Sequence, residues 1–220
     1  MIACGESPVV RRYFDDSKES RLVYAALKGD KAGVEDCLRS GIAIDCRGKY
    51  GVTPLIVVIE LTNKDAVLLL LEKGADPNLQ DDSGQSAMSE AARSEDIWFL
   101  QTVLKHKGDV NLVSKKNEET PLFAAVASRR VANVELVLKS GANINAQEMH
   151  GETALKRAGC FNQFDIMMYL LNAGADYRIE NLSHKTVLYE LQNGGVAPKY
   201  VPERDAVIDW FKKKGFWRQE

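Results

Sequence analysis

One glycine-containing phrase recurs along the chain at a nearly constant interval, and this periodicity limits the fold more than any other feature. Gly74 follows Gly41 by 33 residues, and Gly174 follows Gly141 by the same interval. Gly74 and Gly141 are 67 residues apart, which is two periods plus one residue, and the additional residue falls in 111–118. Such a period indicates similar units that stack on one another, because a single unit cannot bury its own apolar face.

A second phrase keeps the same interval and predicts how each unit folds. It places threonine or serine before proline, alanine or valine, as in Thr53-Pro54 and Thr120-Pro121. Threonine can cap a helix start, and proline is tolerated in the first turn because its missing N–H would be unpaired there. The glycine of the first phrase then ends a second helix in the left-handed conformation. The five copies of the second phrase are residues 51–55, 84–88, 118–122, 151–155 and 184–188.

Together the two phrases resemble the ankyrin repeat, whose 33-residue unit carries a Thr-Pro-Leu-His phrase. This resemblance implies an all-α fold, an ankyrin-repeat solenoid of about six helix-turn-helix units with inter-repeat hairpin loops and terminal caps. We expect this domain over residues 18–217, after an N-terminal tether or processed segment (1–17) and before a tail (218–220). The expected units are residues 18–50, 51–83, 84–117, 118–150, 151–183 and 184–216.

The chain departs from the family phrase at its histidine, which is absent from every unit. The position holds Ile56, Ser89, Phe123, Lys156 and Tyr189. We therefore expect no threonine–histidine hydrogen bonds, apolar packing in the second and fourth units instead, and lower stability than a consensus array.

The terminal units differ from the inner ones in ways that suit caps. The first lacks the proline and carries many charged side chains. In the last, Gly215 follows Gly174 by 41 residues, and the added stretch 193–202 contains glycines and prolines that break the periodicity. A helix is expected to resume over 206–214. The aromatic residues at this end either close the apolar core or form a docking patch: Trp210, Phe211, Phe216 and Trp217.

Composition and motifs argue against several function classes. The formal net charge is −2, four cysteines form no CxxC, and the three histidines are scattered. There is no Gly-x-Ser-x-Gly elbow or phosphate-binding loop, and the carboxylate pairs 81–82 and 118–119 fall in expected hairpins. We expect Cys37 in the core and Cys160 in the turn between two helices. No enzymatic activity, cofactor, metal or nucleic-acid partner is expected, and no oligomer is predicted.

The family resemblance implies a concave binding surface made of hairpin tips and the inner side of each first helix. Tyr50, Arg93, Met149 and Phe161 are the expected anchors, because aromatic, methionine and arginine side chains are enriched at interfaces. The alternative for any one of them is that it is simply exposed or half-packed. The candidate partner-binding residues are Lys49, Tyr50, Asp82, Ser83, Gln85, Arg93, Lys116, Asn117, Glu119, Met149, His150, Glu152, Phe161, Ser183 and His184.

The second half of the chain carries a narrower resemblance. Residues 119–126, 143–147, 151–155 and 162–171 look like the bacterial ankyrin proteins that are paired with phospholipase effectors of type VI secretion. This resemblance implies an immunity protein that binds a cognate lipase toxin and blocks its active-site cleft or its access to lipid. The alternative is a general ankyrin adaptor that joins proteins without inhibiting an enzyme.

The first residues resemble the end of a bacterial lipoprotein signal, in which a small residue precedes a lipid-anchored cysteine. Ala3 and Cys4 occupy these positions, so Cys4 is the lipidation candidate, while the apolar region of such a signal is absent from the sequence. A lipidated Cys4 implies a membrane-anchored periplasmic protein. The alternatives are an accidental cysteine near an ordinary N-terminus and a cytoplasmic protein translated from Met1.

Overall fold

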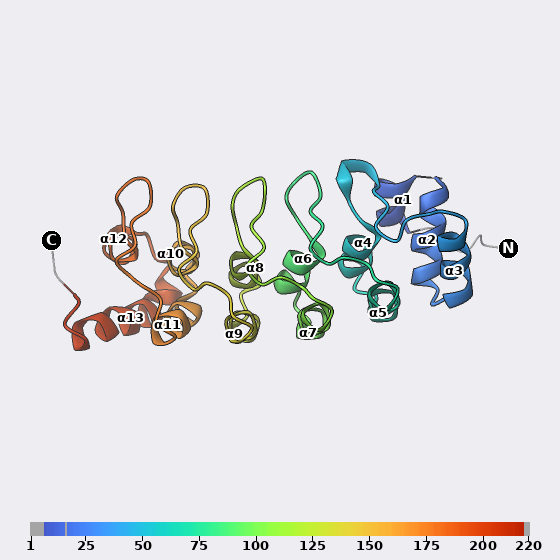
Figure 1. The fold of residues 1–220 in the computed structure, drawn as a ribbon. Coiled ribbons are helices and arrows are strands. Elements are labelled where there is room, and N and C mark those ends of the chain that lie inside the picture. Colours follow the sequence, from blue (N-terminus) through green and yellow to red (C-terminus); the bar gives the residue numbers. More distant parts are fainter. Residues whose placement is uncertain (1–6, 16, 218–220) are drawn as a thin grey trace.

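The chain forms an elongated row of helix pairs in a computed structural model that describes residues 7–15 and 17–217 (Figure 1). The two helices of each of the first five pairs are joined by a short turn, those of the last pair are joined by residues 194–200, and a long hairpin leads from one pair to the next. First helices lie beside the hairpins, and second helices form a parallel row farther from them. Among the described residues, β-pairing is limited to isolated bridges at Gln80–Ser86 and Gln147–Thr153. The all-α repeat solenoid is therefore confirmed.

Six such pairs occur within the described part of the chain, preceded by one short helix. The additional helix is α1 (Pro8–Phe14), and two 3-10 turns lie at Lys49–Gly51 and Pro198–Tyr200. The first helices are α2 (Lys18–Leu27), α4 (Pro54–Glu60), α6 (Ala87–Arg93), α8 (Pro121–Ala127), α10 (Ala154–Cys160) and α12 (Val187–Asn193). The second helices are α3 (Lys31–Arg39), α5 (Lys64–Glu72), α7 (Ile97–Lys105), α9 (Val131–Lys139), α11 (Phe164–Asn172) and α13 (Val201–Lys213).

Helix capping follows the sequence prediction in one of the two threonine-proline phrases. The Thr53 hydroxyl accepts a hydrogen bond from the backbone N–H of Ile56 at 3.4 Å. The cap predicted for Thr120 is wrong, because its hydroxyl is buried without a hydrogen bond and α8 begins on the preorganised Pro121 instead. The predicted left-handed glycines are confirmed, with φ of 88°, 89°, 94° and 94° at Gly41, Gly74, Gly141 and Gly174.

The core runs without interruption through the row, between first and second helices of each unit and between neighbouring units. Ile56 and Phe123, which replace the family histidine, are buried there, so the predicted apolar packing is confirmed. Cys37 is buried as expected. The predicted start of the last helix at residue 206 is wrong: α13 begins at Val201, because Pro202 fits its first turn.

The N-terminal segment is partly helical where we expected a tether. Helix α1 packs against α2 and against the 3-10 turn that begins at Lys49, and it buries Val10 and Phe14. Lys49 Nζ lies 2.7 Å from the Asp15 carboxylate and adds an exposed ion pair to this contact. Residues of this segment therefore cover the first unit. The lipidation candidate Cys4 lies outside the described residues.

Aromatic side chains close the C-terminal end of the row, which confirms the closing role rather than a wholly exposed patch. Phe211 is fully buried, with its ring centroid 5.2 Å from Tyr177 and 5.1 Å from Trp210. Tyr177 also stacks on the partly exposed Phe216 at 4.9 Å. Trp210 Nε1 donates a hydrogen bond to Asn172 Oδ1 at 3.1 Å, which ties α13 to α11.

A ladder of side-chain amides and carboxylates joins successive units beside the helix-ending glycines. Each member accepts a hydrogen bond from a backbone N–H of the next unit, so these bonds tie each unit to the following one. The steps are Asp76 N–H to Asp45 (3.1 Å), Asp109 N–H to Asn78 (2.8 Å), Asn143 N–H to Asn111 (2.8 Å) and Asp176 N–H to Asn145 (2.9 Å).

Within the described residues, the helices are too short or too polar to cross a bilayer.

Candidate protein-binding face

The hairpins and the first helices together form one side of the molecule, which we call the finger face. The fingers are residues 47–52, 80–85, 113–119, 147–152 and 180–185, and they project in a row beyond α4, α6, α8, α10 and α12 (Figure 1). Loops held on a rigid scaffold in this way are common sites of recognition.

Backbone hydrogen bonds hold neighbouring fingers in register. The N–H of Asp82 donates to Tyr50 O at 2.9 Å, and the N–H of Leu182 donates to His150 O at the same distance. Long polar side chains add a second contact, since Gln80 Nε2 donates to Val113 O at 2.7 Å and Gln147 Nε2 to Glu180 O at 3.1 Å. The fingers are therefore stacked rather than independent, and a partner meets a preorganised surface.

Three of the four expected anchors present large apolar surface to solvent. Tyr50 is 67% exposed and Phe161 is 53% exposed, and Met149 is likewise exposed on a fingertip. Arg93 is held in place, because its guanidinium donates to Gln85 Oε1 at 3.1 Å and lies 3.3 Å from Glu90. The structure does not bring these four together: Tyr50 and Met149 lie on separate fingers, Arg93 ends α6, and Phe161 follows α10 at its end away from the fingers.

Most other candidate residues lie on the fingers and take part in contacts within them. Asp82, Ser83, Lys116, Asn117, Ser183 and His184 occupy hairpin tips. Three of these candidates are engaged in ion pairs: Lys49 with Asp15 at 2.7 Å, Glu119 with Arg157 at 2.6 Å, and Glu152 with Lys156 at 3.3 Å. The ring Nδ1 atoms of His150 and His184 lie 2.9 Å from the Glu148 carboxylate and 3.1 Å from the Glu180 carboxylate.

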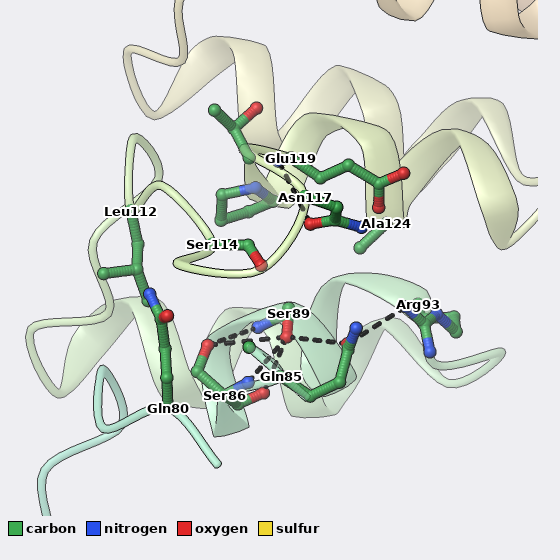
Figure 2. Close-up of a pocket in the computed structure, with 13 residues that line it drawn as sticks. Gln80, Gln85, Ser86, Ser89, Arg93, Leu112, Ser114, Asn117, Glu119 and Ala124 are labelled. Atoms are coloured by element: carbon green, nitrogen blue, oxygen red, sulfur yellow. Dashed lines mark hydrogen bonds between the residues drawn. The ribbon is translucent and has the colours of Figure 1, made fainter. Parts of the chain in front are cut away.

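A small polar hollow lies between the third and fourth units on this face (Figure 2). Ser86 and Ser89 form a capping box at the start of α6, and Gln85 lies between Ser89 and Arg93. Ser114, Asn117 and Glu119 face them from the next finger. Most side chains that line the hollow are polar, so this part of the face suits hydrogen bonding rather than apolar insertion. The polar ones are Gln80, Gln85, Ser86, Ser89, Arg93, Ser114, Asn117, Glu119 and Thr120.

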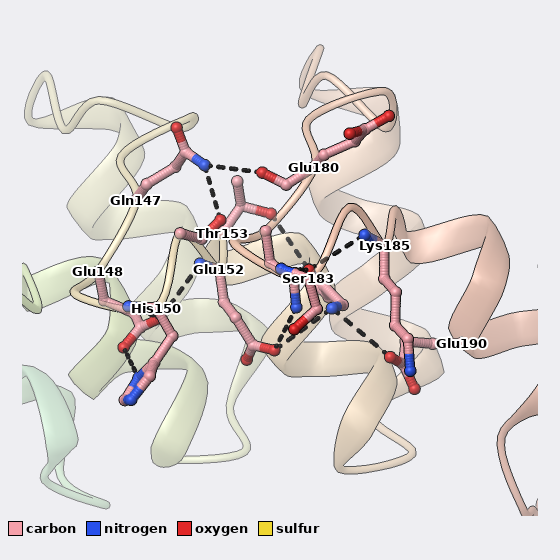
Figure 3. A network of polar contacts seen from close by, with 12 residues as sticks. Gln147, Glu148, His150, Glu152, Thr153, Glu180, Ser183, Lys185 and Glu190 are labelled. Atoms are coloured by element: carbon pink, nitrogen blue, oxygen red, sulfur yellow. Dashed lines mark hydrogen bonds and ion pairs between the residues drawn. The ribbon is translucent and has the colours of Figure 1, made fainter.

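Sequence reasoning missed a second polar network, in the fifth and sixth units (Figure 3). Lys156 is only 3% exposed, and its ammonium lies 3.3 Å from Glu152 and 3.5 Å from Glu190. The neighbouring Arg157 pairs with Glu119 and lies over the Phe123 ring at 5.0 Å from the centroid. The spacing of Glu152 and Lys156 by one helical turn was the signal available in the sequence.

The buried carboxylate of Glu148 accepts hydrogen bonds within the fourth finger. Burial acts to raise its pKa, but hydrogen bonds from the His150 ring and from the backbone N–H groups of Glu152 and His150 outweigh this, so its pKa lies below the ordinary value of 4.5. The ionised carboxylate therefore stabilises the folded finger.

We expect the replacement of Glu148 with glutamine to make the free energy of unfolding less dependent on pH under acidic conditions. A carboxyl whose pKa is depressed by folding contributes stability above its unfolded-state pKa, and this contribution disappears as the pH falls through the lower folded-state value. Urea unfolding from about pH 6 to about pH 3 should show a smaller loss for Glu148→Gln than for the wild type. Glu180→Gln, which alters the exposed carboxylate of the next finger, is the matched control. If the free energy of unfolding fell with pH by the same amount in the wild type and in Glu148→Gln, the lowered pKa of Glu148 would be contradicted.

The cysteine at the end of α10 does not have the surroundings of a nucleophile. Cys160 is exposed and ends the helix rather than lying in the turn. Burial of its sulfur raises its pKa, and the carboxylates of Glu190 and Glu152 raise it further. Its thiol is therefore protonated at neutral pH. In the described part of the chain, no three His, Cys, Asp or Glu side chains are grouped as metal ligands.

Comparison with known proteins places this architecture in a family. The model of ankyrin repeats (three copies) matches residues 22–114 and 89–181, so the chain belongs to the ankyrin-repeat family. The solved structure of the ankyrin repeat protein EF0377 superposes with a TM-score of 0.72 at 26% identity, covering 86% of this chain and 96% of that one. Ankyrin repeats are protein-binding scaffolds, and the chain has the fold of such a scaffold.

Two curated proteins are similar to most of the chain's length. Protein PhlB of Serratia liquefaciens is 31% identical over 155 residues, which are 68% of this chain and 66% of PhlB. The potassium channel AKT2/3 of Arabidopsis thaliana is 29% identical over 157 residues, which are 71% of this chain and 19% of the channel. The chain thus spans less than two thirds of the length of each of these relatives.

Proposed function

We propose that the chain is an immunity protein that binds a secreted phospholipase through its finger face and neutralises it. The observation that carries the binding role is the exposure of Tyr50, Met149 and Phe161 on a face whose fingers are hydrogen-bonded in register. Large apolar side chains on a rigid surface favour association, because little conformational freedom is lost on binding. The phospholipase as partner is supported by the resemblance of residues 119–126 and 162–171 to ankyrin immunity proteins, and the likeness to Protein PhlB of Serratia liquefaciens is consistent with a bacterial origin.

Blocking is the mechanism that this face favours. A row of fingers and first helices offers a broad surface that can cover an active-site cleft or the surface through which a lipase meets lipid. The chain's own groups do no covalent chemistry in this mechanism. We also propose that a precursor carries the lipoprotein signal upstream of Cys4 and that the protein is anchored in the periplasm. Incorporation of a labelled fatty acid that is lost in Cys4→Ala would support this location.

The test of the proposed function is a pull-down of the tagged chain from native bacterial lysate, followed by mass spectrometry and a lipase assay of the recovered partner. We expect a phospholipase whose activity is suppressed in the complex. Tyr50→Ala, Arg93→Ala and Phe161→Ala should each weaken binding by about tenfold, without a change in unfolding. Recovery of an active lipase or an unrelated protein would instead make the chain an adaptor. Unchanged affinity in all three variants would show that the finger face is not the binding surface.

A further inference from the structure

The turn between the first and second helix of a unit follows one backbone pattern in four of the first five units, and the third unit departs from it. In the regular turn, the second residue has a left-handed φ of 54° to 68°, and its N–H donates to a carbonyl in the last turn of the first helix. These residues are Gly29, Thr62, Arg129 and Asn162. Residues 94–96 of the third unit, all of which the structure describes, have no positive φ. The α6–α7 turn therefore has a conformation of its own.

A side chain of the fourth unit bonds the carbonyls of this turn. Asn133 on α9 is fully buried, and its Nδ2 donates to Ala92 O at 3.0 Å and to Ser94 O at 2.7 Å. Ala92 O corresponds to Ile59 O of the second unit, which accepts from the N–H of the left-handed Thr62 at 2.8 Å. The amide of Asn133 thus takes the place of a backbone hydrogen bond within the turn.

Asn133 differs from the residues that correspond to it in three other units. At the third position of α5, α7 and α11 these are Ala66, Phe99 and Ile166. None of these side chains can donate a hydrogen bond to a carbonyl, and the turns of the units that precede them are all regular. The departure of the α6–α7 turn from the pattern therefore coincides with the buried amide of the following unit.

The residues of the turn itself do not account for its conformation. Ser94 Oγ accepts from Asp96 N–H at 3.2 Å, but Ser128 Oγ accepts from Arg130 N–H at the same distance in a regular turn. Glu95 occupies the left-handed position, which threonine, arginine and asparagine adopt elsewhere in this chain. The contact from α9 is therefore the feature that distinguishes the α6–α7 turn.

The α6–α7 turn belongs to the candidate binding surface. Ser94 follows α6 at the position that the exposed anchor Phe161 has after α10. Together with Thr62 and Arg93, residues 94–96 line a groove of about 510 Å³ between the second and third units. A partner that contacts Arg93 therefore meets the turn beside it.

We infer that Asn133 is a positioning residue of the binding face, which holds the α6–α7 turn out of the left-handed conformation from the neighbouring unit. This inference rests on the proposed protein-binding function. Asn133 Oδ1 is buried without a hydrogen bond, and such an atom destabilises a fold. An apolar residue would avoid this cost, so packing alone does not explain an asparagine at this position.

The conformation of the turn in the free, full chain is the first test. Asn133→Leu keeps a similar side-chain volume and removes both donated bonds. We expect its crystal structure to show a left-handed φ at Glu95, with the Glu95 N–H bonded to Ala92 O and exchanging more slowly with deuterium than in the wild type. The double variant Asn133→Leu, Glu95→Gly should show the same turn, and it serves if the single variant is poorly folded, because glycine adopts this φ without strain.

Glu95→Gly alone separates the role of Asn133 from that of the local sequence. It should keep the turn of the wild type, because the amide of Asn133 still bonds both carbonyls. Asn63→Asp is the matched control: Asn63 Nδ2 donates to Leu27 O of the preceding unit at 3.3 Å, and its Oδ1 caps α5. Aspartate removes the bond to the other unit but keeps the cap, so the left-handed φ of Gly29 should persist.

Binding is the second measurement. We expect Asn133→Leu to weaken the complex with the phospholipase about fivefold, because a residue without ligand contacts acts through the element that it holds. Asn63→Asp should leave the affinity unchanged.

The outcomes separate this inference from the proposed function. An unchanged turn in Asn133→Leu, or a left-handed φ at position 95 in Glu95→Gly alone, would overturn the inference. A changed turn with unchanged affinity would also overturn it, while leaving the proposed function intact. If the wild type binds no phospholipase, the proposed function fails, and a turn that changes only when Asn133 is replaced still supports the inference.

Discussion

Replacement of Phe211 with alanine is expected to lower the free energy of unfolding by about 3–5 kcal/mol, the usual cost of removing a large buried aromatic side chain. Phe211 is fully buried at the end of the array, between Tyr177 and Trp210. Because each unit of a repeat protein contacts only its neighbours, the loss should act mainly on α12 and α13.

Urea unfolding followed by circular dichroism and by tryptophan fluorescence measures this effect. Two of the three tryptophans, Trp210 and Trp217, lie in the C-terminal cap, so the larger part of the fluorescence change should precede the loss of the remaining helices seen by circular dichroism. Trp98 on α7 reports the later step. Phe216→Ala is the control, because Phe216 is partly exposed and stacks only at the rim. A cost for Phe211→Ala as small as that of Phe216→Ala would show that the cap does not depend on this ring.

The repeat period made much of the architecture predictable. Thr53 caps α4 and Gly74 ends α5 as their phrases require, since both roles depend on local backbone geometry. Thr120 shows where this reasoning stops: the same phrase lacks the hydrogen bond, and the side chain is buried in the fourth unit. Likewise α13 begins before the periodic pattern resumes, because Pro202 permits a first turn that apolar spacing does not reveal.

The sequence predicted which residues of the candidate face are exposed better than it predicted which of them contact one another. Tyr50, Met149 and Phe161 are exposed because their places in the unit point away from the stacking surfaces. The ion pairs of Glu119 with Arg157 and of Lys49 with Asp15 join residues 38 and 34 positions apart, and the sequence carries no pairing signal at such separations.

Lys156 offers the second large effect, because it is a buried cation in the place of the family histidine. Its ammonium lies between the carboxylates of Glu152 and Glu190, which come from the start of its own unit and from α12 of the next. Replacement with methionine keeps most of the side-chain volume but leaves two carboxylates without their cation. Breaking a fully buried pair costs about 3–5 kcal/mol. Since Glu152 and Glu190 are each about a quarter exposed and can turn toward water, we expect Lys156→Met to cost about 2 kcal/mol.

A thermodynamic cycle separates the charge effect from packing. The triple variant Lys156→Met, Glu152→Gln, Glu190→Gln removes both carboxylates together with the ammonium, and a well-packed neutral replacement of a buried ionic group is often close to neutral in stability. We expect it to unfold within about 1 kcal/mol of the wild type in urea, above the single variant. A triple variant that is less stable than Lys156→Met would mean that the glutamates stabilise α10 and α12 independently of Lys156. The expected recovery would instead identify this buried triad as the group that joins the fifth unit to the terminal one, in place of the threonine–histidine contact that the chain lacks.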